Sequence, residues 1–232
     1  MEKKVEKIFR HEMKYLISVG QIQLIKNRIN HIIPLDYHVG VYGIYTIRSL
    51  YFDDYENRCY YENENGTDPR EKFRIRIYNH SSERITLECK RKERGKTLKT
   101  SCPLTLEQTR MLMEGKPIPD IASQPEVLRK LTLQMITRQM KPVVIVEYDR
   151  IPYVYRNGNV RVTLDMNVSA STAVDKFLEE QIPKRPIMPM GQHLLEVKFD
   201  EYLPYFIHHN LNLHSLTQIA YSKYYLCRKY TR

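Results

Sequence analysis

Two segments of the chain alternate between cationic and apolar residues with the period of two that a β-strand imposes. Residues Lys72–Tyr78 read Lys-Phe-Arg-Ile-Arg-Ile-Tyr, and residues Arg84–Lys92 read Arg-Ile-Thr-Leu-Glu-Cys-Lys-Arg-Lys. Each strand is therefore expected to have one apolar face and one face dominated by Lys and Arg. Guanidinium and ammonium groups are the usual protein ligands of phosphate oxygens, so these faces are candidate phosphate-binding surfaces.

The same alternation recurs in other segments that read as strands. It places these residues on cationic faces: Arg10, Glu12 and Lys14; Tyr148 and Arg150; Arg161; Glu196 and Lys198. A single strand of this kind is typical of any antiparallel sheet with one solvated face. Recurrence over five or six strands favours faces that converge on one cavity. Burying an unpaired cation there costs on the order of several kcal/mol of folding free energy, and a bound chain of phosphates would offset this cost.

Carboxylates stand among these cations and are candidate metal ligands. Glu12, Glu88 and Glu196 share the strand faces with Lys and Arg, and a hard divalent cation that bridges them to phosphate would suit such oxygens. Neutralisation of the neighbouring cations is the alternative role for Glu12 and Glu88. The four cysteines show no zinc-ligand spacing, and Ser222 has no identifiable His–Asp pair that would make it a nucleophile.

Composition is compatible with this interpretation and narrows the class of protein. A net charge of +10 and a pI near 9.3 indicate polyanionic partners, namely phosphate compounds, nucleic acid or an anionic membrane surface. The length of 232 residues suits a single domain spanning residues 1–232. No apolar run approaches the length of a membrane span, and the first residues are too charged for a secretory signal, so we expect a cytoplasmic protein. The oligomeric state does not follow from the sequence.

The periodicity predicts about eight strands and few helices. Strands are expected at Lys7–Ile17, Tyr42–Phe52, Cys59–Glu64, Arg70–Tyr78, Arg84–Lys92, about Thr97–Cys102, Pro142–Arg156, Asn159–Asp165 and His193–Asp200. Helices are expected from Ser18 to about Ile33, at Thr105–Glu114, at about Pro125–Met140 and at His214–Tyr230. The proline-containing stretch from Val168 to about Gly191 reads as a loop, interpreted as a mobile lid. This order predicts an α+β fold: a closed antiparallel β-barrel tunnel with flanking helices and a C-terminal plug helix.

The ordered motifs resemble a known family, the VTC-type polyphosphate polymerase domain, which is a branch of the triphosphate tunnel metalloenzymes that also include the CYTH proteins. The resemblance covers nearly the whole chain. It rests on the series Arg10-His-Glu-Met-Lys-Tyr15, Arg48-Ser-Leu-Tyr-Phe-Asp53, Lys72-Phe-Arg-Ile-Arg76, Leu87-Glu-Cys-Lys90, Glu147-Tyr-Asp-Arg150, Arg161-Val-Thr-Leu-Asp165, Leu195-Glu-Val-Lys198 and Tyr221-Ser-Lys223. CYTH proteins usually begin with ExExK, whereas this chain has Arg10-x-Glu12-x-Lys14, which favours the VTC branch.

The resemblance implies roles for individual residues. The cations that would line the tunnel and act on the transferred phosphate are Lys14, Arg74, Arg76, Lys90, Arg150, Arg161 and Lys198. The residues that would assist substrate binding are Arg10, Arg48, Lys72, Lys92, Tyr148, Ser222 and Lys223. Glu196 resembles the family's metal-binding carboxylate, with Mn²⁺ or Mg²⁺ as the expected ion, and Glu12 and Glu88 are the further candidates.

The resemblance also implies an activity: a metal-dependent phosphotransferase that adds the γ-phosphoryl group of ATP to a polyphosphate chain. Two alternatives remain open. The same tunnel would serve a metal-dependent tripolyphosphatase or nucleoside triphosphatase with water as acceptor, or a non-catalytic module that binds polyphosphate or nucleic acid. Nucleic acid is the less expected partner, because the cations are assigned to an interior. No SPX domain and no membrane helices, which eukaryotic relatives have, are expected in this sequence. The resemblance therefore does not imply regulation by an SPX domain or translocation coupled to synthesis.

Overall fold

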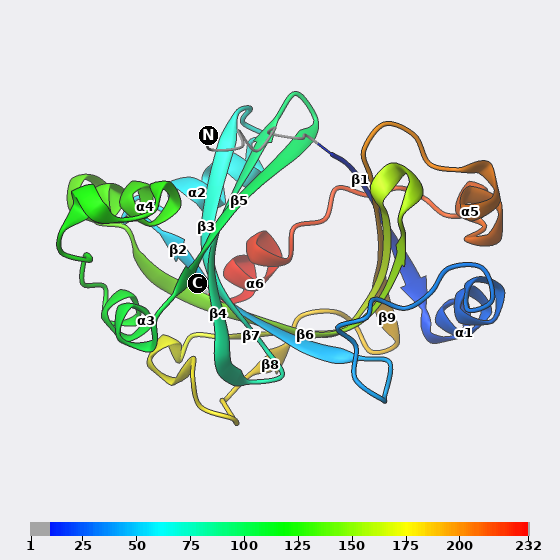
Figure 1. Ribbon diagram of the computed structural model, residues 1–232, viewed down its shortest axis with the longest axis horizontal. Coiled ribbons are helices and arrows are strands. Elements are labelled where there is room, and N and C mark those ends of the chain that lie inside the picture. The colour runs from blue at the N-terminus through cyan, green and yellow to red at the C-terminus, as the bar shows by residue number, and fades with distance from the viewer. Residues whose placement is uncertain (1–9, 232) are drawn as a thin grey trace.

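A single antiparallel sheet forms the centre of the protein. The computed structural model describes residues 10–231 and contains nine strands in these residues (Figure 1). Eight of them follow the order β1-β9-β7-β6-β2-β3-β4-β5, and the short β8 pairs with β7. The bounds are β1 His11–Ser18, β2 Tyr45–Asp53, β3 Arg70–Tyr78, β4 Ser81–Glu93, β5 Lys96–Leu104, β6 Lys141–Tyr155, β7 Val160–Ser171, β8 Arg185–Pro186 and β9 Gln192–Phe199. The expected α+β class and antiparallel sheet are confirmed.

The sheet curls but does not close into the barrel that the sequence predicted. Within residues 10–231, its edge strands, β1 and β5, form no continuous ladder. They meet at one antiparallel bridge, where Arg10 N donates to Thr97 O at 3.0 Å and Thr97 N donates to Arg10 O at 3.1 Å. The result is an open, curled half-barrel with a concave and a convex face. Alternation of residue type fixes which face a side chain occupies, whereas closure depends on hydrogen bonding between distant edges.

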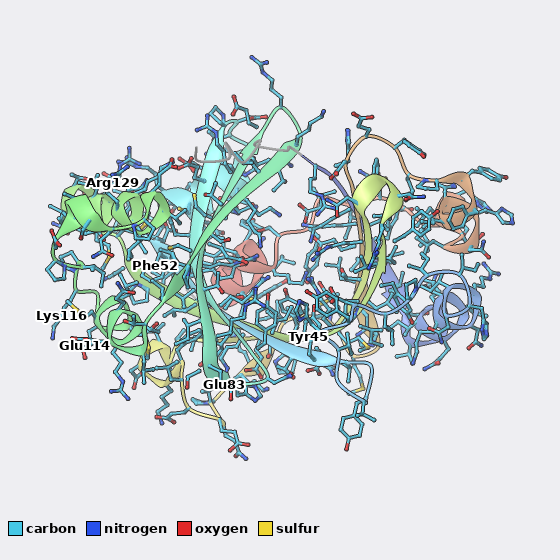
Figure 2. The ribbon with its side chains drawn as sticks, viewed as in Figure 1. Tyr45, Phe52, Glu83, Glu114, Lys116 and Arg129 are labelled. Atoms are coloured by element: carbon cyan, nitrogen blue, oxygen red, sulfur yellow. The ribbon has the colours of Figure 1, made fainter. Side chains whose placement is uncertain are left out.

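Apolar side chains cover the convex face in two clusters of buried residues, as the alternation predicted. Phe73, Ile75 and Ile77 of β3 are buried there, in a layer shared with α3 (Leu106–Met113) and α4 (Glu126–Arg138). The second cluster packs β1, β7 and β9 against α1 (Val19–Ile29) and α5 (Tyr205–Asn210). Figure 1 shows these two helix pairs at opposite ends of the curled sheet, both outside its curve. Phe52 lies in the first layer, and Lys116 and Arg129 lie outside it (Figure 2).

Side-chain caps explain where the expected helices begin. Ser18 caps α1 and Thr105 caps α3, and each forms a reciprocal capping box with the glutamine three residues later. Helix α1 ends at Ile29, a few residues before the expected end. Short 3₁₀ turns occupy Ile121–Ser123, Asn157–Asn159, Val174–Lys176 and Leu213–Ser215. Within the described residues, no helix has the length and apolar character needed to cross a membrane.

The segment expected to be a strand at Cys59–Glu64 is instead α2 (Arg58–Glu64). The Asp53 carboxylate accepts hydrogen bonds from the backbone N–H groups of Cys59 at 2.9 Å and Tyr60 at 3.2 Å, and Asp54 accepts from that of Arg58 at 2.9 Å. These carboxylates satisfy the free N–H groups of the first turn and so stabilise a helix. The Cys and Tyr residues of this segment favour a strand. The Asp53 and Asp54 carboxylates that stabilise the helix lie several residues earlier in the chain, so the segment itself does not indicate a helix.

The C-terminal region also differs from the prediction. The helix expected to begin at His214 begins only at Lys223, as α6 (Lys223–Thr231). In the extended segment before it, Gln218 forms an isolated antiparallel bridge with Tyr15 of β1. Helix α5 was not predicted. Strand β7 extends to Ser171, beyond the expected end at Asp165, and the first three residues of the expected strand Lys7–Ile17 lie outside the described residues. Helix α6 lies at the concave side of the sheet (Figure 1).

Candidate active site

A cavity of about 810 Å³ lies at the concave face, between the sheet and α6. Ten Lys and Arg side chains and three Glu side chains line it. The predicted site residues that it brings together are Glu12, Lys14, Lys72, Arg74, Arg76, Lys90, Lys92, Tyr148, Arg150, Glu196, Lys198, Ser222 and Lys223. The cationic strand faces therefore converge, although the sheet is open.

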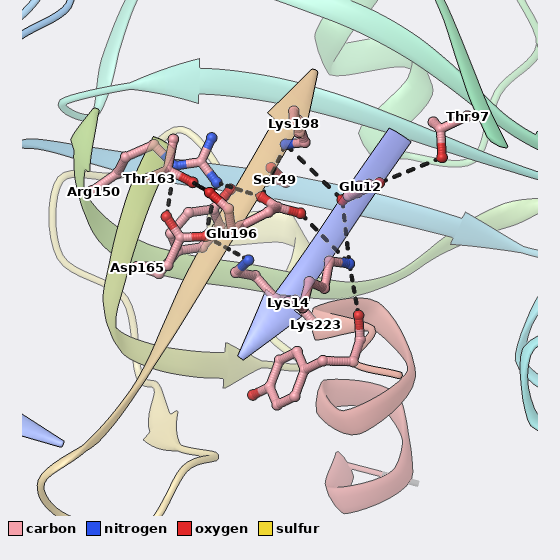
Figure 3. A network of polar contacts seen from close by, with 12 residues as sticks. Glu12, Lys14, Ser49, Thr97, Arg150, Thr163, Asp165, Glu196, Lys198 and Lys223 are labelled. Carbon is pink, nitrogen blue, oxygen red and sulfur yellow. Dashed lines mark hydrogen bonds and ion pairs between the residues drawn. The ribbon is translucent and has the colours of Figure 1, made fainter. Parts of the chain in front are cut away.

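Two carboxylates and two lysines from β1 and β9 form the centre of the cavity (Figure 3). Lys14 Nζ lies 3.2 Å from Glu12 Oε1 and 3.5 Å from Glu196 Oε1. Lys198 Nζ lies 2.9 Å from Glu196 Oε2 and 4.0 Å from Glu12 Oε1. The β1–β9 register places Glu12 opposite Lys198 and Lys14 opposite Glu196. Positive and negative side chains therefore alternate along each strand and also between the two strands. Lys90 of β4 adds a 2.7 Å ion pair to Glu12 across the gap between β1 and β5.

Burial and these neighbours set the charge state of the centre. Burial alone would raise the pKa of Glu12, but Lys90 and Lys14 outweigh it and lower the pKa to about 2. Burial would likewise raise the pKa of Glu196, yet Lys198, Lys223 and Lys14 hold it well below its usual range. Both carboxylates are therefore ionised at neutral pH. Burial lowers the pKa of Lys198 to about 8, against the opposing effect of Glu196.

A second charged group is built around Asp165, which is fully buried on β7. Arg150 donates two hydrogen bonds to its carboxylate, at 2.6 and 2.7 Å, and Lys223 Nζ lies 2.5 Å from it. The Tyr148 ring lies beside both cations, 5.2 Å from the Arg150 guanidinium carbon and 4.7 Å from Lys223 Nζ. Arg150 also reaches Glu196 at 3.3 Å, which joins this group to the centre.

The arginines of β3 are held by partners on both neighbouring strands. Arg74 donates to Glu88 of β4 at 2.7 Å and to the Tyr51 hydroxyl of β2 at 2.8 Å. Arg76 donates to Ser49 Oγ at 3.2 Å. These contacts fix the two guanidinium groups in the cavity wall before any ligand binds, which reduces the entropy that a phosphate would have to remove.

Helix α6 supplies the remaining polar groups, and a buried hydrogen bond fixes its position. The Tyr224 hydroxyl donates to Asp53, which is fully buried at the end of β2. Ser222 and Lys223, the two residues before Tyr224, line the cavity. Lys14 Nζ donates to the Tyr221 carbonyl at 2.7 Å, so β1 also contacts the segment that leads into the helix.

Four predicted site residues do not line the cavity. Arg48 is buried on the convex side, where it pairs with Glu147 at 2.5 Å and donates to the carbonyls of Phe177, Glu179 and Glu180. Arg10 forms an ion pair with Asp200 at 2.9 Å, and Arg161 is exposed. Glu88 is a buried partner of Arg74 and of Lys99, which lies 3.0 Å away.

The contacts of Arg48 also contradict the lid interpretation of residues 168–191. None of the residues 172–191 lines the cavity, and Val174, Leu178 and Ile182 pack against the apolar cluster of the convex face. The resemblance implies that Arg48 assists substrate binding, whereas the structure places its side chain on the convex side. Strand β2 is buried on both sides, so its alternation of residue type carries no signal for a face.

Several residues of the site were missed by the sequence reasoning. The sequence reasoning groups Asp165 with Arg161 on one strand face without giving it a role, and it assigns neither Arg70 nor Lys99 to the site, although β5 alternates Thr97, Lys99 and Ser101. Extending the period-of-two argument to β5 would have found Lys99. Asp53 and Asn63 act through contacts between elements distant in sequence, and no local pattern indicates them.

Glu12 and Glu196 fit a divalent metal better than Glu88 does. They are two ionised carboxylates on adjacent strands, and within the described residues Glu12 Oε1 is a buried acceptor that receives no hydrogen bond. Mg²⁺ is often held by one or two carboxylates together with substrate phosphates. No group of three or more His, Cys, Asp and Glu side chains in residues 10–231 would hold a metal alone, so substrate oxygens would have to complete the coordination.

Comparison with known proteins agrees with this geometry. The VTC domain family matches residues 9–231. A candidate adenylate cyclase from Bacillus halodurans superposes with a TM-score of 0.51 at 17% identity, covering 92% of this chain and 95% of that one. A candidate adenylyl cyclase from Hippeastrum with a dominant triphosphatase activity superposes with a TM-score of 0.54 at 12% identity, covering 96% and 95%. At these identities the likeness shows a shared fold. No curated protein matches the chain.

Proposed function

The chain belongs to the VTC domain family, and we propose that it is a polyphosphate polymerase that transfers the γ-phosphoryl group of ATP to the end of a polyphosphate chain. The observation that carries the proposal is the excess of ten cations over three carboxylates in one cavity. Phosphoryl transfer through a loose transition state requires positioning and charge neutralisation more than covalent chemistry, and such a cavity supplies both.

The charge state of the carboxylates favours a phosphate acceptor over water. Glu12, Glu196 and Asp165 all have pKa values lowered by neighbouring cations, against the opposing effect of burial, so each is a weak base. Each of these three carboxylates is also paired with Lys or Arg. Water must lose a proton to attack phosphorus, whereas the end of a polyphosphate chain is already anionic and needs no base. The arrangement therefore supports transfer more directly than hydrolysis.

The proposal gives the side chains distinct roles. Arg74 and Arg76, held by Glu88 and Ser49, bind and orient phosphates along β3. Lys14, Lys198 and the pair of Arg150 and Lys223 surround the transferring group and stabilise the charge that develops on it. Glu12 and Glu196 would hold a Mn²⁺ or Mg²⁺ ion, which supplies further neutralisation of the phosphate oxygens when bound.

A product assay tests the proposal. The purified protein is incubated with ATP, Mn²⁺ and a short polyphosphate primer, and the products are separated by gel electrophoresis while ADP is quantified. We expect longer chains, with one ADP released for each phosphate added. Orthophosphate as the only phosphate product would assign the chain to the triphosphatase alternative. Tight binding of polyphosphate without any product would assign it to the non-catalytic alternative.

A further inference from the structure

Rows of like charge cross one end of the cavity. In the register of β3 and β4, Lys72 lies opposite Lys90, and Arg70 lies opposite Lys92. Successive rows on one face are about 7 Å apart, because a strand advances about 3.3 Å per residue. The outer row lies where Gly66 and Gly95 also line the cavity, and we call this end, with Arg70, Lys72 and Lys92, the mouth. Like charges placed directly opposite each other destabilise a sheet, so the rows are costly to the empty protein.

The mouth differs from the rest of the cavity in the absence of compensating carboxylates. Lys14, Arg74, Arg150, Lys198 and Lys223 each have a carboxylate within ion-pair distance. Within residues 10–231, no carboxylate lies within ion-pair distance of Arg70, Lys72 or Lys92, whereas 21 such pairs exist elsewhere. The cations of the mouth therefore lack the counter-ions that the centre provides for itself.

The contacts that these cations do make are to neutral groups. Lys72 Nζ donates to Asn63 Oδ1 at 2.5 Å and lies 4.9 Å from the centre of the Tyr224 ring. The Arg70 guanidinium donates to the Thr67 carbonyl at 2.7 Å. Burial, followed by the charge of Arg70, lowers the pKa of Lys72 to about 7, and burial with Arg70 also lowers that of Lys92. The protein thus holds three basic side chains at the mouth, and none of them has an internal counter-ion among the described residues.

We propose that Arg70, Lys72 and Lys92 form a separate phosphate subsite, which holds the polyphosphate chain beyond its reacting end. This inference rests on the proposed function and adds a direction to it. The reacting phosphates would lie near Glu12 and Glu196, where a metal fits, and the chain would leave the cavity across the row that Arg70 and Lys92 form on the face of β3 and β4. A linear polyanion matches the subsite because two rows of cations in succession require a ligand whose charges also repeat along a line.

The test compares ligands of different length on the same variant. The double variant Arg70→Gln/Lys92→Gln and the unchanged protein are titrated with triphosphate and with a polyphosphate several times longer, without metal or ATP, so that only binding is measured. We expect the affinity for the longer chain to fall about tenfold or more, because each lost contact is charge-assisted. The affinity for triphosphate should fall much less, since the centre is intact.

A matched control removes the same amount of charge elsewhere. Lys116→Gln/Arg129→Gln alters two exposed cations on the outer helix layer (Figure 2), and we expect little change in affinity for either ligand. Loss of net charge alone would weaken both double variants equally and would overturn the proposal. An equal loss for triphosphate and for the long chain in Arg70→Gln/Lys92→Gln would also overturn it, because the mouth would then belong to the reacting centre.

The melting temperature provides a second readout that does not depend on any ligand. If the mouth lacks counter-ions, removing two of its cations should raise the melting temperature of the empty protein, whereas loss of structural contacts would lower it. Because neither measurement involves turnover, a protein that binds long chains through the mouth but makes no polyphosphate would contradict the proposed polymerase and leave the subsite supported. The two failures are therefore distinguishable.

Discussion

At the scale of single residues, the cavity contains two kinds of cation. Lys14 and Lys198 share two carboxylates, Glu12 and Glu196, at distances of 2.9 to 4.0 Å. Lys72 contacts an amide oxygen and an aromatic ring instead. The first kind keeps its charge through an internal partner, and the second depends on a ligand for compensation. The two kinds predict different responses to mutation and to pH.

Glu196 tests the metal assignment. Replacing it by Gln preserves size and hydrogen bonding but removes the charge that a hard divalent ion requires, so we expect turnover with Mn²⁺ to fall by about 100-fold or more. The same change frees Lys198 and Lys14 from a counter-ion, so metal-free affinity for triphosphate should rise. Glu83→Gln, an exposed change on β4 (Figure 2), is the control. Unchanged turnover at saturating Mn²⁺ would leave Glu196 as a counter-ion only.

Lys72 predicts a specific pH dependence. Its pKa is lowered to about 7 in the empty protein, first by burial and then by Arg70. A bound phosphate favours the ammonium form and raises this pKa, so binding takes up a proton above about pH 7. The affinity for long polyphosphate, which reaches the mouth, should therefore decrease as the pH rises from about 7 toward the higher pKa of the complex. Calorimetric titration in buffers of different ionisation enthalpy measures the proton uptake.

The variant Lys72→Arg provides the comparison, because a guanidinium keeps its charge over this whole range. We expect it to bind long polyphosphate with a shallower pH dependence and with less proton uptake near pH 8. Should the arginine variant retain the full slope, the titrating group lies elsewhere in the cavity.

At the scale of elements, the position of α6 is set by one buried contact. Tyr224 donates to Asp53, and the same carboxylate accepts from three backbone N–H groups, those of Asp54, Cys59 and Tyr60. Asp53 therefore connects the end of β2, the first turn of α2 and the first turn of α6. Ser222 and Lys223 enter the cavity because this contact holds the residue that follows them.

We expect Tyr224→Phe to destabilise the protein by about 1.5 to 3 kcal/mol, the range for a hydrogen bond to a charged group. Tyr225→Phe is the matched control on the same helix, because the Tyr225 hydroxyl donates to Glu64 near the surface at 3.0 Å. This control should cost about 0.5 kcal/mol or less. Urea unfolding measures both. Equal losses for the two variants would show that the buried carboxylate does not fix the helix.

At the scale of the whole molecule, the concentration of positive charge at one concave face links stability to ligand binding. The net charge of +10 is distributed unevenly, with ten Lys and Arg around one cavity. A polyanion that binds only the folded state must stabilise it. At a ligand concentration about one hundred times the dissociation constant, the gain is roughly 2.7 kcal/mol.

For a domain of this size, that gain corresponds to a rise of roughly 5 to 10 °C in melting temperature. Triphosphate should produce it, and the same amount of phosphate supplied as orthophosphate should produce much less, because only a linked chain engages several cations at once. Duplex DNA should also have little effect, since a wide helix cannot enter the curled sheet. Stabilisation by DNA equal to that by triphosphate would mean that the cations act as an open surface.

The sequence by itself determined which residues share a face. The alternation in β3, β4 and β9 correctly grouped Lys72, Arg74 and Arg76, then Lys90, then Glu196 and Lys198, because side-chain direction in a strand is fixed by the local backbone. The order of the motifs identified the VTC family. Each of these signals is contained within a few consecutive residues, so no knowledge of distant contacts was needed.

Tertiary structure alone decided the features that depend on distant partners. Closure of the sheet depends on hydrogen bonds between its two edges, and within residues 10–231 only Arg10, just before β1, and Thr97 of β5 form them. Arg48 faces away from the cavity, and the sequence does not reveal this because β2 is covered on both sides and lacks the polar-apolar contrast that marks a face. Residues 59–64 form a helix because the caps come from Asp53 and Asp54 upstream. In each case, the deciding interaction joins residues that no local periodicity relates.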